Sequence, residues 1–352
     1  MKVAFITGVT GQDGSYLSEF LLDKGYKVVG LTRICSESKH ERIEHLKSNP
    51  LFHMVDGDLS DTARIDTIIK SLIEYDTIEV YNLGAQSHVH LSFANPEYTA
   101  NVDALGTLRI LEAIHKTGHS EKYKFYQAGT SEMFGKVTQP IQNEETPFHP
   151  RSPYGVSKVF GYWITKNYRE SYDMFACTGI LFNHESERRG ENFVTRKITL
   201  GLNEYLNHGT PIEIGNTEAR RDWGYAKDYV EAMWLMLQRD TPDDYVISTG
   251  KTHSIKDFIE TCLDELGISY RWREDGSCIQ TDLEDTHKFG DDAEEGIPRV
   301  ICRINSDFFR PAEVDVLIGD ASKAKRELGW EPKTDFNALV KLMLKNDVTK
   351  YT

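Results

Sequence analysis

The stretch KVAFITGVTGQDG, residues 2–14, decides the fold of this chain. Residues 2–7 are an apolar run rich in β-branched side chains, which is typical of a buried strand. Glycines follow at positions 8, 11 and 14, and a helical pattern then covers residues 15–24 before a capping Gly25. Dinucleotide binding requires a glycine turn between a first strand and a first helix, although ordinary strand–helix connections also use such turns.

Each glycine has its own task if this turn binds a dinucleotide. Gly8 allows the tight turn, Gly11 lets the backbone approach a pyrophosphate, and Gly14 lets the helix pack closely on the sheet. The N–H groups and the dipole at the start of the helix then favour the phosphates.

Strand and helix patterns keep alternating after the turn. Strands are predicted over residues 27–32, 52–55, 78–83, 125–128 and 176–182, with helices over residues 102–117 and 157–171 among them. This alternation predicts an α/β fold with a Rossmann-type doubly wound parallel sheet and helices on both faces.

The regular alternation of strand and helix patterns ends in the second half of the chain. Residues 183–224 carry few strand runs, and residues 273–298 are acidic and are interpreted as an exposed loop or a short excursion. Helices are predicted over residues 226–237 and 254–266, and a strand over residues 245–249 that rejoins the sheet.

These patterns suggest two interleaved domains. We expect a dinucleotide-binding domain from residues 1–182 with about 222–250, and a smaller α/β substrate domain from residues 183–221 and 251–352. A ligand crevice is expected between them, at the carboxyl ends of the strands.

Composition excludes several classes of protein. The 41 Lys and Arg against 55 Asp and Glu give a net charge of −14, which opposes nucleic-acid binding. No apolar run approaches the ~20 residues of a membrane span. The five cysteines are scattered without C-x-x-C spacing, so we expect no disulfide framework, no metal site and a cytoplasmic location.

The end of the second predicted strand bears on the cofactor. NAD-binding proteins usually place an acid there for the ribose 2′-OH, whereas this chain has Thr32 and Arg33. An arginine suits a 2′-phosphate and favours NADP, although a single Arg is also a common surface residue. Asp58 and Leu59, after the third strand, are placed to approach the adenine.

Two short motifs could carry acid–base chemistry. Tyr154 and Lys158 are spaced to share one helix face, where the lysine could lower the pKa of the phenol. Thr130 and Glu132 follow a predicted strand and could contact a substrate hydroxyl and a neighbouring carbon. Helix capping and a solvated first-turn acid are the plainer explanations for that second pair.

Together these motifs resemble the extended short-chain dehydrogenase/reductases and, among them, the GDP-mannose 4,6-dehydratase family. The resemblance covers nearly the whole chain. It is carried by TGVTGQDGSYL (7–17), YNLGAQSHV (81–89), PEYTANVDALGTLR (96–109), RSPYGVSK (151–158), ILFNHES (180–186), RRGENFVTRKIT (188–199), RDWG (221–224) and FRPAEV (309–314).

The resemblance implies an internal redox cycle on a GDP-sugar. NADP takes a hydride from C4 while Tyr154 removes the O4 proton, assisted by Lys158 and Thr130. Glu132 then removes the C5 proton and assists loss of the C6 hydroxyl as water. The hydride returns to C6, so a 4-keto-6-deoxy sugar forms without net consumption of cofactor.

Binding residues carry over from the resemblance by position. The cofactor residues are Gly8, Gly11, Gln12, Asp13, Gly14, Arg33, Asp58, Leu59, Leu83, Ala85, Ser87, Tyr98, Lys158, His184 and Arg189. The substrate residues are Ser87, His90, Gly129, Asn183, Val194, Lys197, Arg221, Arg310 and Glu313. A packed histidine and solvated arginines are the plainer alternatives for His184 and for the cationic positions.

Several positions depart from the family pattern. Ile34 follows Arg33 where a second basic residue is usual, and Glu187 replaces a proline. Gly129 stands where serine is usual and His90 where a small apolar residue is usual. Because Gly129 would leave room beside the sugar and His90 would add a polar partner, we hypothesise a sugar larger than mannose, such as a GDP-linked manno-heptose.

Two other functions remain as alternatives at this stage. One is a nucleotide-sugar epimerase or reductase, and the other is a dinucleotide-sensing protein without catalytic activity. Glu132 counts against the first, and the Tyr154–Lys158 pair against the second. The resemblance also implies a homodimer or homotetramer, with residues 35–42 reaching a neighbouring subunit's cofactor site.

Overall fold

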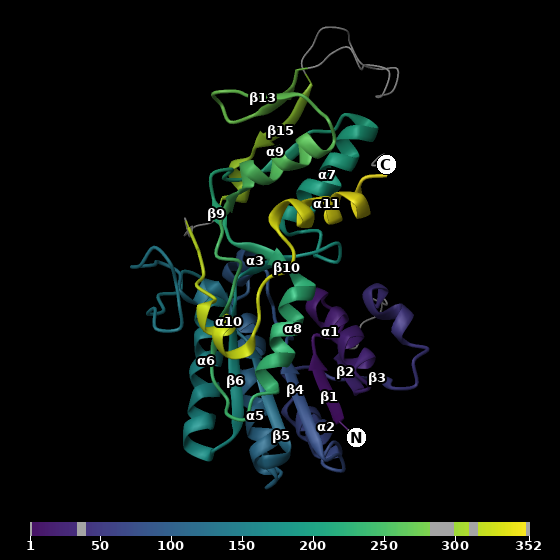
Figure 1. Cartoon of the computed structure of the whole chain (residues 1–352), viewed down its shortest axis with the longest axis vertical. Coiled ribbons are helices and arrows are strands. Elements are labelled where there is room, and N and C mark those ends of the chain that lie inside the picture. The colour runs from purple at the N-terminus through teal and green to yellow at the C-terminus, as the bar shows by residue number, and fades with distance from the viewer. Residues whose placement is uncertain (1, 34–39, 282–298, 310–315, 350–352) are drawn as a thin grey trace.

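The computed structural model describes residues 2–33, 40–281, 299–309 and 316–349 (Figure 1). The candidate residues Arg310 and Glu313 lie outside these ranges, as does most of the segment 35–42. Within the described ranges, no helix is both long and apolar enough to cross a bilayer.

A seven-stranded sheet forms the centre of the larger part of the molecule. Its neighbouring strands all pair in parallel, in the order β11-β6-β5-β4-β1-β2-β3. The strands are β1 (Lys2–Thr7), β2 (Lys27–Thr32), β3 (Phe52–Asp56), β4 (Thr77–Asn82), β5 (Tyr123–Ala128), β6 (Phe175–Leu181) and β11 (Tyr245–Ile247). The predicted doubly wound parallel sheet is confirmed, and the order reverses between β1 and β4, where such folds bind ligands.

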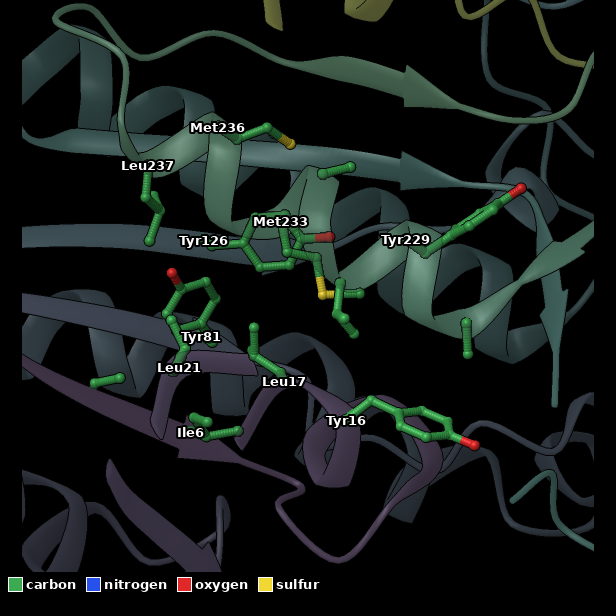
Figure 2. Packing of buried hydrophobic residues seen from close by; sticks show 14 of the residues in the cluster. Ile6, Tyr16, Leu17, Leu21, Tyr81, Tyr126, Tyr229, Met233, Met236 and Leu237 are labelled. Atoms are coloured by element: carbon green, nitrogen blue, oxygen red, sulfur yellow. The ribbon is translucent and has the colours of Figure 1, made fainter. Parts of the chain in front are cut away.

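Helices cover both faces of this sheet. On one face α1 (Gln12–Asp23) packs beside α8 (Ala226–Leu237), and on the other α5 (Leu105–Lys116) lies between α2 (Thr62–Ser71) and α6 (Pro153–Tyr172). Figure 2 shows the first face, where side chains of α1 and α8 meet the sheet residues Ile6, Tyr81 and Tyr126. Because these side chains are almost fully buried, the apolar sequence runs dictate the layers.

A second hydrophobic cluster lies at one end of the sheet, at the top of Figure 1. It is built from the helices α7 (Val194–His208), α9 (Ile255–Glu265) and α11 (Phe336–Asp347). They pack with a small sheet of order β13 (Tyr270–Trp272), β14 (Cys278–Gln280), β15 (Val300–Ile304) and β8 (Ile212–Ile214).

Short strands join the two clusters. β7 (Asn183–Glu185) pairs in parallel with β10 (Trp223–Tyr225), and β9 (Arg220–Arg221) pairs antiparallel with β12 (His253–Ser254). Farther along, α10 (Ser322–Leu328) returns to pack on α8 and β11. The buried Trp330 anchors this return by donating from its indole nitrogen to the carbonyl oxygen of Asp228 at 2.8 Å.

The structure corrects some predicted elements. α1 begins at Gln12, so the glycine turn is shorter than expected, and the helix predicted over residues 102–117 starts as a π-helical turn, η2 (Ala100–Ala104). The sequence interpretation had no helix where α7 lies. Residues 273–298 are not simply an exposed loop, because β14 within them is buried between β13 and β15.

Candidate active site

One cavity of about 1000 Å³ opens at the carboxyl ends of the central strands. All the candidate site residues that the structure describes line it. They are Gly8, Gly11, Gln12, Asp13, Gly14, Arg33, Asp58, Leu59, Leu83, Ala85, Ser87, His90, Tyr98, Gly129, Thr130, Glu132, Tyr154, Lys158, Asn183, His184, Arg189, Val194, Lys197 and Arg221. Residues far apart in sequence therefore share a single space.

The glycine turn follows β1 and is too tight for larger residues. Gly8 has φ +69°, and a Cβ there would lie 2.9 Å from the backbone of Gly84. A Cβ at Gly14 would lie 2.3 Å from the carbonyl oxygen of Gly8. These contacts leave the backbone N–H groups at the start of α1 close to the cavity, as an anion-binding turn needs.

Gln12 and Asp13 tie this turn to β7. The Gln12 amide donates to the carbonyl oxygen of His184 at 3.1 Å and accepts from the Ser186 hydroxyl at 2.7 Å. The two ring nitrogens of His184 lie 2.8 Å from an Asp13 carboxylate oxygen and 2.8 Å from the carbonyl oxygen of Phe182. The Phe182 carbonyl can only accept, so Nδ1 donates to it, and Nε2 faces the Asp13 carboxylate, which favours a second proton on the ring.

In the His184–Asp13 pair, each charge offsets the cost of burying the other. Burial opposes the charged form of each group, but the opposite charge raises the pKa of His184 and lowers that of Asp13. A buried pair of opposite charges therefore lies beside the glycine turn, and it holds Asp13 and His184 in place there.

Arginines from two elements line the cavity near the glycine turn and the end of β2. The Arg33 guanidinium, at the end of β2, donates to the Tyr98 hydroxyl at 2.7 Å. Arg42, from η1 (Glu41–Leu46), donates to the carbonyl oxygens of Thr10 and Arg188 at 3.3 and 2.8 Å and also lines the cavity. Sequence reasoning missed Arg42, whose contacts lie within its own chain, in a segment expected to reach a neighbour.

Local capping places the candidate catalytic groups. Ser152 caps α6 by accepting from the Gly155 N–H at 3.0 Å, and Pro153 opens the helix. A Cβ at Gly155 would lie 2.8 Å from the carbonyl oxygen of Glu132, so the missing side chain brings α6 against η4 (Ser131–Met133). This approach puts Tyr154, Thr130 and Glu132 on one wall of the cavity.

The phenol of Tyr154 does not have the low pKa expected from the sequence. Burial raises its pKa, and the negative charges of Asp103 and Glu132 act in the same direction. A hydrogen bond from Thr130 and the charge of Arg189 oppose the rise. Thr130 also caps η4, and its contact with a substrate hydroxyl stays a prediction.

Lys158 lies beside Tyr154 but hydrogen-bonds elsewhere. Its Nζ is 5.7 Å from the centre of the Tyr154 ring and donates to the carbonyl oxygen of Ala128 at 3.0 Å. Burial lowers the pKa of Lys158. The expected influence of Lys158 on the pKa of Tyr154 therefore stays a prediction that rests on its charge, whereas Thr130 and Arg189 are the groups that oppose the rise in this arrangement.

Gly129 does not enlarge the cavity in the expected way. A Cβ at this position would lie 2.8 Å from the carbonyl oxygen of Gly179 and 2.9 Å from the Thr178 side chain, both on β6. The Gly129 N–H donates to the same Gly179 oxygen at 2.8 Å. Glycine here permits close approach of β6, so its missing side chain leaves room on the sheet side and not beside a sugar.

The end of the cavity farthest from the glycine turn is lined by α7 and η6 (Ser306–Phe308). The Lys197 ammonium lies 3.3 Å from the centre of the Phe308 ring. The Arg189 guanidinium lies 3.7 Å from the Phe193 ring centre and pairs with Glu185 at 3.0 Å. Phe193 and Phe308 were not predicted, because nothing local marks an aromatic residue as a cavity wall.

Comparison with known proteins decides the family. A sequence model of GDP-mannose 4,6 dehydratase matches residues 5–343. A GDP-mannose 4,6 dehydratase of Drosophila melanogaster is 52% identical over 354 aligned positions, which cover 99% of this chain and 86% of the relative. The Homo sapiens protein of that name is 49% identical, with 99% and 91% covered. The chain belongs to the GDP-mannose 4,6-dehydratase family.

Solved structures extend the likeness at the level of the fold. A Bacillus anthracis dTDP-glucose 4,6-dehydratase superposes with a TM-score of 0.77 at 18% identity, covering 98% of this chain and 96% of that one. A Bacillus cereus UDP-glucuronic acid 4-epimerase gives 0.79 at 21% identity, covering 99% of both. The GDP-mannose 4,6-dehydratase family thus shares its architecture with other nucleotide-sugar enzymes.

Proposed function

We propose that this chain catalyses NADP-dependent 4,6-dehydration of a GDP-sugar of the GDP-mannose type. The observation that carries the proposal is the convergence of Tyr154, Thr130 and Glu132 on the cavity that the glycine turn also lines. A phenol and a carboxylate on one wall can move protons at two different carbons of one sugar ring. Membership of the dehydratase family supports the same reaction.

The residues present fit a nicotinamide dinucleotide. The tight glycine turn at Gly8 and Gly14 and the α1 N-terminus suit a pyrophosphate, with the His184–Asp13 pair beside them. When bound, the nicotinamide would accept a hydride from C4 of the sugar and return it to C6. Arg33, which follows β2, and Arg42, which contacts Thr10 of the glycine turn, supply two guanidinium groups for a 2′-phosphate, which supports NADP over NAD.

Oxidation at C4 is assigned to Tyr154 and Thr130. Tyr154 accepts the O4 proton, and the Thr130 hydroxyl hydrogen-bonds the phenol. The Lys158 ammonium, 5.7 Å from the ring centre, stabilises the phenolate through its charge. The anchored Ala128 carbonyl keeps this ammonium in place.

Elimination at C5 and C6 is assigned to Glu132. The 4-keto group acidifies the C5 hydrogen, and the Glu132 carboxylate removes it as a proton. The C6 hydroxyl leaves as water when the resulting carboxylic acid returns the proton to it. C5 takes a proton from solvent when C6 is reduced, and Tyr154 releases the O4 proton to solvent, so the net products are the 4-keto-6-deoxy sugar and one water.

The cationic residues at the opposite end are proposed to hold the GDP moiety. Lys197 and Arg221 would neutralise its pyrophosphate, with Asn183 and Val194 beside them. Arg310 and Glu313 remain proposed partners on family resemblance alone. In this scheme residues 1–182 with about 222–250 hold the cofactor, and residues 183–221 and 251–352 hold the nucleotide sugar.

The sugar is proposed to be mannose, with a manno-heptose as the alternative that His90 supports. His90 lines the cavity with its ring centre 6.5 Å from that of His88, so it offers a polar group near the substrate. Gly129 does not support a larger sugar, because a Cβ at this position would meet β6 and not the sugar. Comparison of kcat/KM for GDP-mannose and the GDP-heptose decides the matter, and a clear preference for the heptose would overturn the choice of mannose.

We also propose a cytoplasmic homodimer or homotetramer. α6 exposes Val156, Phe160 and Trp163 on one stripe at helical spacing, and the neighbouring α5 exposes Leu105. A second copy of the same chain could bury this apolar face through a two-fold contact.

Incubation with GDP-mannose and NADP tests the reaction. NMR is expected to show a GDP-4-keto-6-deoxy sugar, with no net rise in absorbance of reduced cofactor. Glu132→Gln is nearly isosteric and should block dehydration while thermal unfolding stays close to that of the wild type. A C4-epimerised product, or wild-type turnover by Glu132→Gln, would contradict the assignment.

A further inference from the structure

A chain of buried hydrogen bonds runs across the central sheet toward Lys158. The Thr7 hydroxyl, on β1, donates to the Asn82 side-chain oxygen at 2.7 Å, and the Asn82 amide donates to the Gln127 side-chain oxygen at 2.8 Å. The Gln127 amide then donates to the carbonyl oxygen of Ala128 at 3.2 Å. That oxygen also accepts from Lys158, so the network holds the only described hydrogen-bond acceptor of the ammonium.

Asp103 joins this network from the π-helical turn η2. Its backbone carbonyl accepts from the Thr107 hydroxyl at 3.0 Å, and Thr107 in turn contacts the Gln127 side-chain oxygen at 3.1 Å. η2 packs on α6, where a Cβ at Gly161 would lie 3.7 Å from the Asp103 carbonyl oxygen. Gly161 is one helical turn beyond Lys158, so Asp103 faces the same side of α6 as the lysine.

The Asp103 carboxylate is only half satisfied. It is 2% exposed, and one oxygen accepts from the N–H of Gln86 at 2.7 Å. The other oxygen is buried and has no hydrogen-bond partner among the residues that the structure describes. A buried half-satisfied carboxylate costs free energy unless a nearby positive charge compensates it.

Lys158 is a buried cation whose described hydrogen-bond acceptor carries no negative charge. Its side chain is 3% exposed, and its hydrogen bond goes to a neutral carbonyl oxygen. Burial lowers the pKa of Lys158, whereas the negative charges of Asp103 and Asp13 favour the ammonium. Burial raises the pKa of Asp103 to about 6, and the charge of Lys158 opposes that rise.

We propose that Asp103 is a positioning residue of the active site, whose buried carboxylate is the counter-charge that keeps Lys158 an ammonium beside Tyr154. This inference rests on the proposed function. Asp103 acts through Lys158 and through the Gln86 N–H, which fixes the loop that carries the cavity residues Ala85 and Ser87.

The proposal predicts a signature in the pH profile. The groups that act on Tyr154 are Asp103, Glu132 and Arg189, with the Thr130 hydroxyl. Removing the negative charge of Asp103 lowers the pKa of both Tyr154 and Lys158, because that charge raises each of them. The alkaline limb of the profile, where Lys158 loses its proton, should therefore move to lower pH.

The test is the pH dependence of kcat/KM for GDP-mannose in Asp103→Asn. The amide can still accept from the Gln86 N–H, and the alkaline limb is expected to shift down by about one pH unit. Glu79→Gln is the matched control, because Glu79 is a buried carboxylate on β4 that bonds Tyr26 and Tyr81 away from the cavity. In Glu79→Gln the alkaline limb of the pH profile should lie at the same pH as in the wild type.

Other outcomes overturn the proposal. If the alkaline limb of the kcat/KM profile is not shifted in Asp103→Asn, whether or not its maximum is lower, the charge of Asp103 does not act on the catalytic pair. Equal shifts in Glu79→Gln mean that the effect is not local. If Asp103→Asn does not fold, Asp103→Ser gives the same test, because its hydroxyl can also accept from Gln86. Absence of wild-type turnover of GDP-mannose contradicts the proposed function instead.

Discussion

Tyr154 and Glu132 lie on one wall of the cavity but are assigned protons on different carbons. Tyr154 comes from the first turn of α6 and Glu132 from η4. Single-residue changes can therefore separate oxidation at C4 from elimination at C5 and C6.

Tyr154→Phe should slow oxidation at C4 by about 10²- to 10⁴-fold, because it removes the group that accepts the O4 proton. The measurement is the appearance of reduced cofactor in a single turnover. Tyr162→Phe is the control, since Tyr162 is buried on the same helix outside the cavity lining. Normal single-turnover reduction in Tyr154→Phe would refute the assigned base.

The His184–Asp13 pair predicts a pH-dependent stability. The pKa of His184 is raised on folding, so its contribution is complete below the unfolded value near 6.5 and is lost as pH rises through the folded value. The difference in Tm between wild type and His184→Gln should therefore shrink from pH 6 toward alkaline pH. A difference that is constant across this range would show that the histidine is not charged.

Residue-scale prediction worked where a motif is local in sequence. The glycine turn, the Tyr154–Lys158 spacing and the Thr130–Glu132 pair all line the cavity. Arg42 and Asp103 were missed because their partners, Thr10 and Gln86, are distant in sequence and meet them only in the folded chain. The error at Gly129 has the same cause, since the sequence does not show that β6 lies against it.

At the scale of elements, the start of α1 depends on the absence of a side chain at Gly14. In Gly14→Ala the new Cβ would lie 2.3 Å from the Gly8 carbonyl oxygen, so the helix must move and the turn must open. We expect dinucleotide affinity to fall at least tenfold and the free energy of unfolding to fall by about 1–3 kcal/mol. Calorimetric titration with NADP and thermal unfolding measure the two effects.

Gly25→Ala provides the matched control at the other end of α1. Gly25 has φ +79°, and no atom of the described residues would lie within 4 Å of a Cβ added there. The backbone strain of alanine at this φ should cost about 1 kcal/mol without touching the turn. Equal losses of NADP affinity in both variants would mean that stability, and not the shape of the turn, controls binding.

Helices and strands with a strong periodic pattern were mostly predicted correctly, and those with a weak pattern were missed. The strands of the central sheet and α8 were recognised from their apolar runs, with α8 matching at both ends. α7 was missed although Ile198, Leu202, Tyr205 and Leu206 recur at helical spacing and are buried. β14 is only three residues long within an acidic stretch, so its burial depends on β13 and β15 and leaves no local signal.

At the scale of the whole molecule, the acidic composition and the anionic ligands are compatible. The chain carries a net charge of −14, yet Arg33, Arg42, Lys197 and Arg221 line the cavity together with the His184 imidazolium. Folding gathers these positive groups at one place. The overall charge argued against nucleic-acid binding but did not reveal this local field.

Trp163→Glu tests the proposed association of copies. Trp163 is 54% exposed and belongs to the apolar stripe on α6, so a charge there should weaken a contact between copies while leaving the fold intact. Light scattering should show a dimer or tetramer for the wild type and a smaller species for the variant. A monomeric wild type, or no change in the variant, would contradict this interface.

The central claim is that one cavity oxidises, dehydrates and reduces the same sugar. The most direct measurement follows deuterium from C4 of GDP-[4-²H]mannose through turnover with catalytic NADP. The account predicts a GDP-4-keto-6-deoxy product that carries the deuterium at C6, with no accumulation of reduced cofactor. Deuterium retained at C4, or stoichiometric reduced cofactor carrying the label, would contradict it.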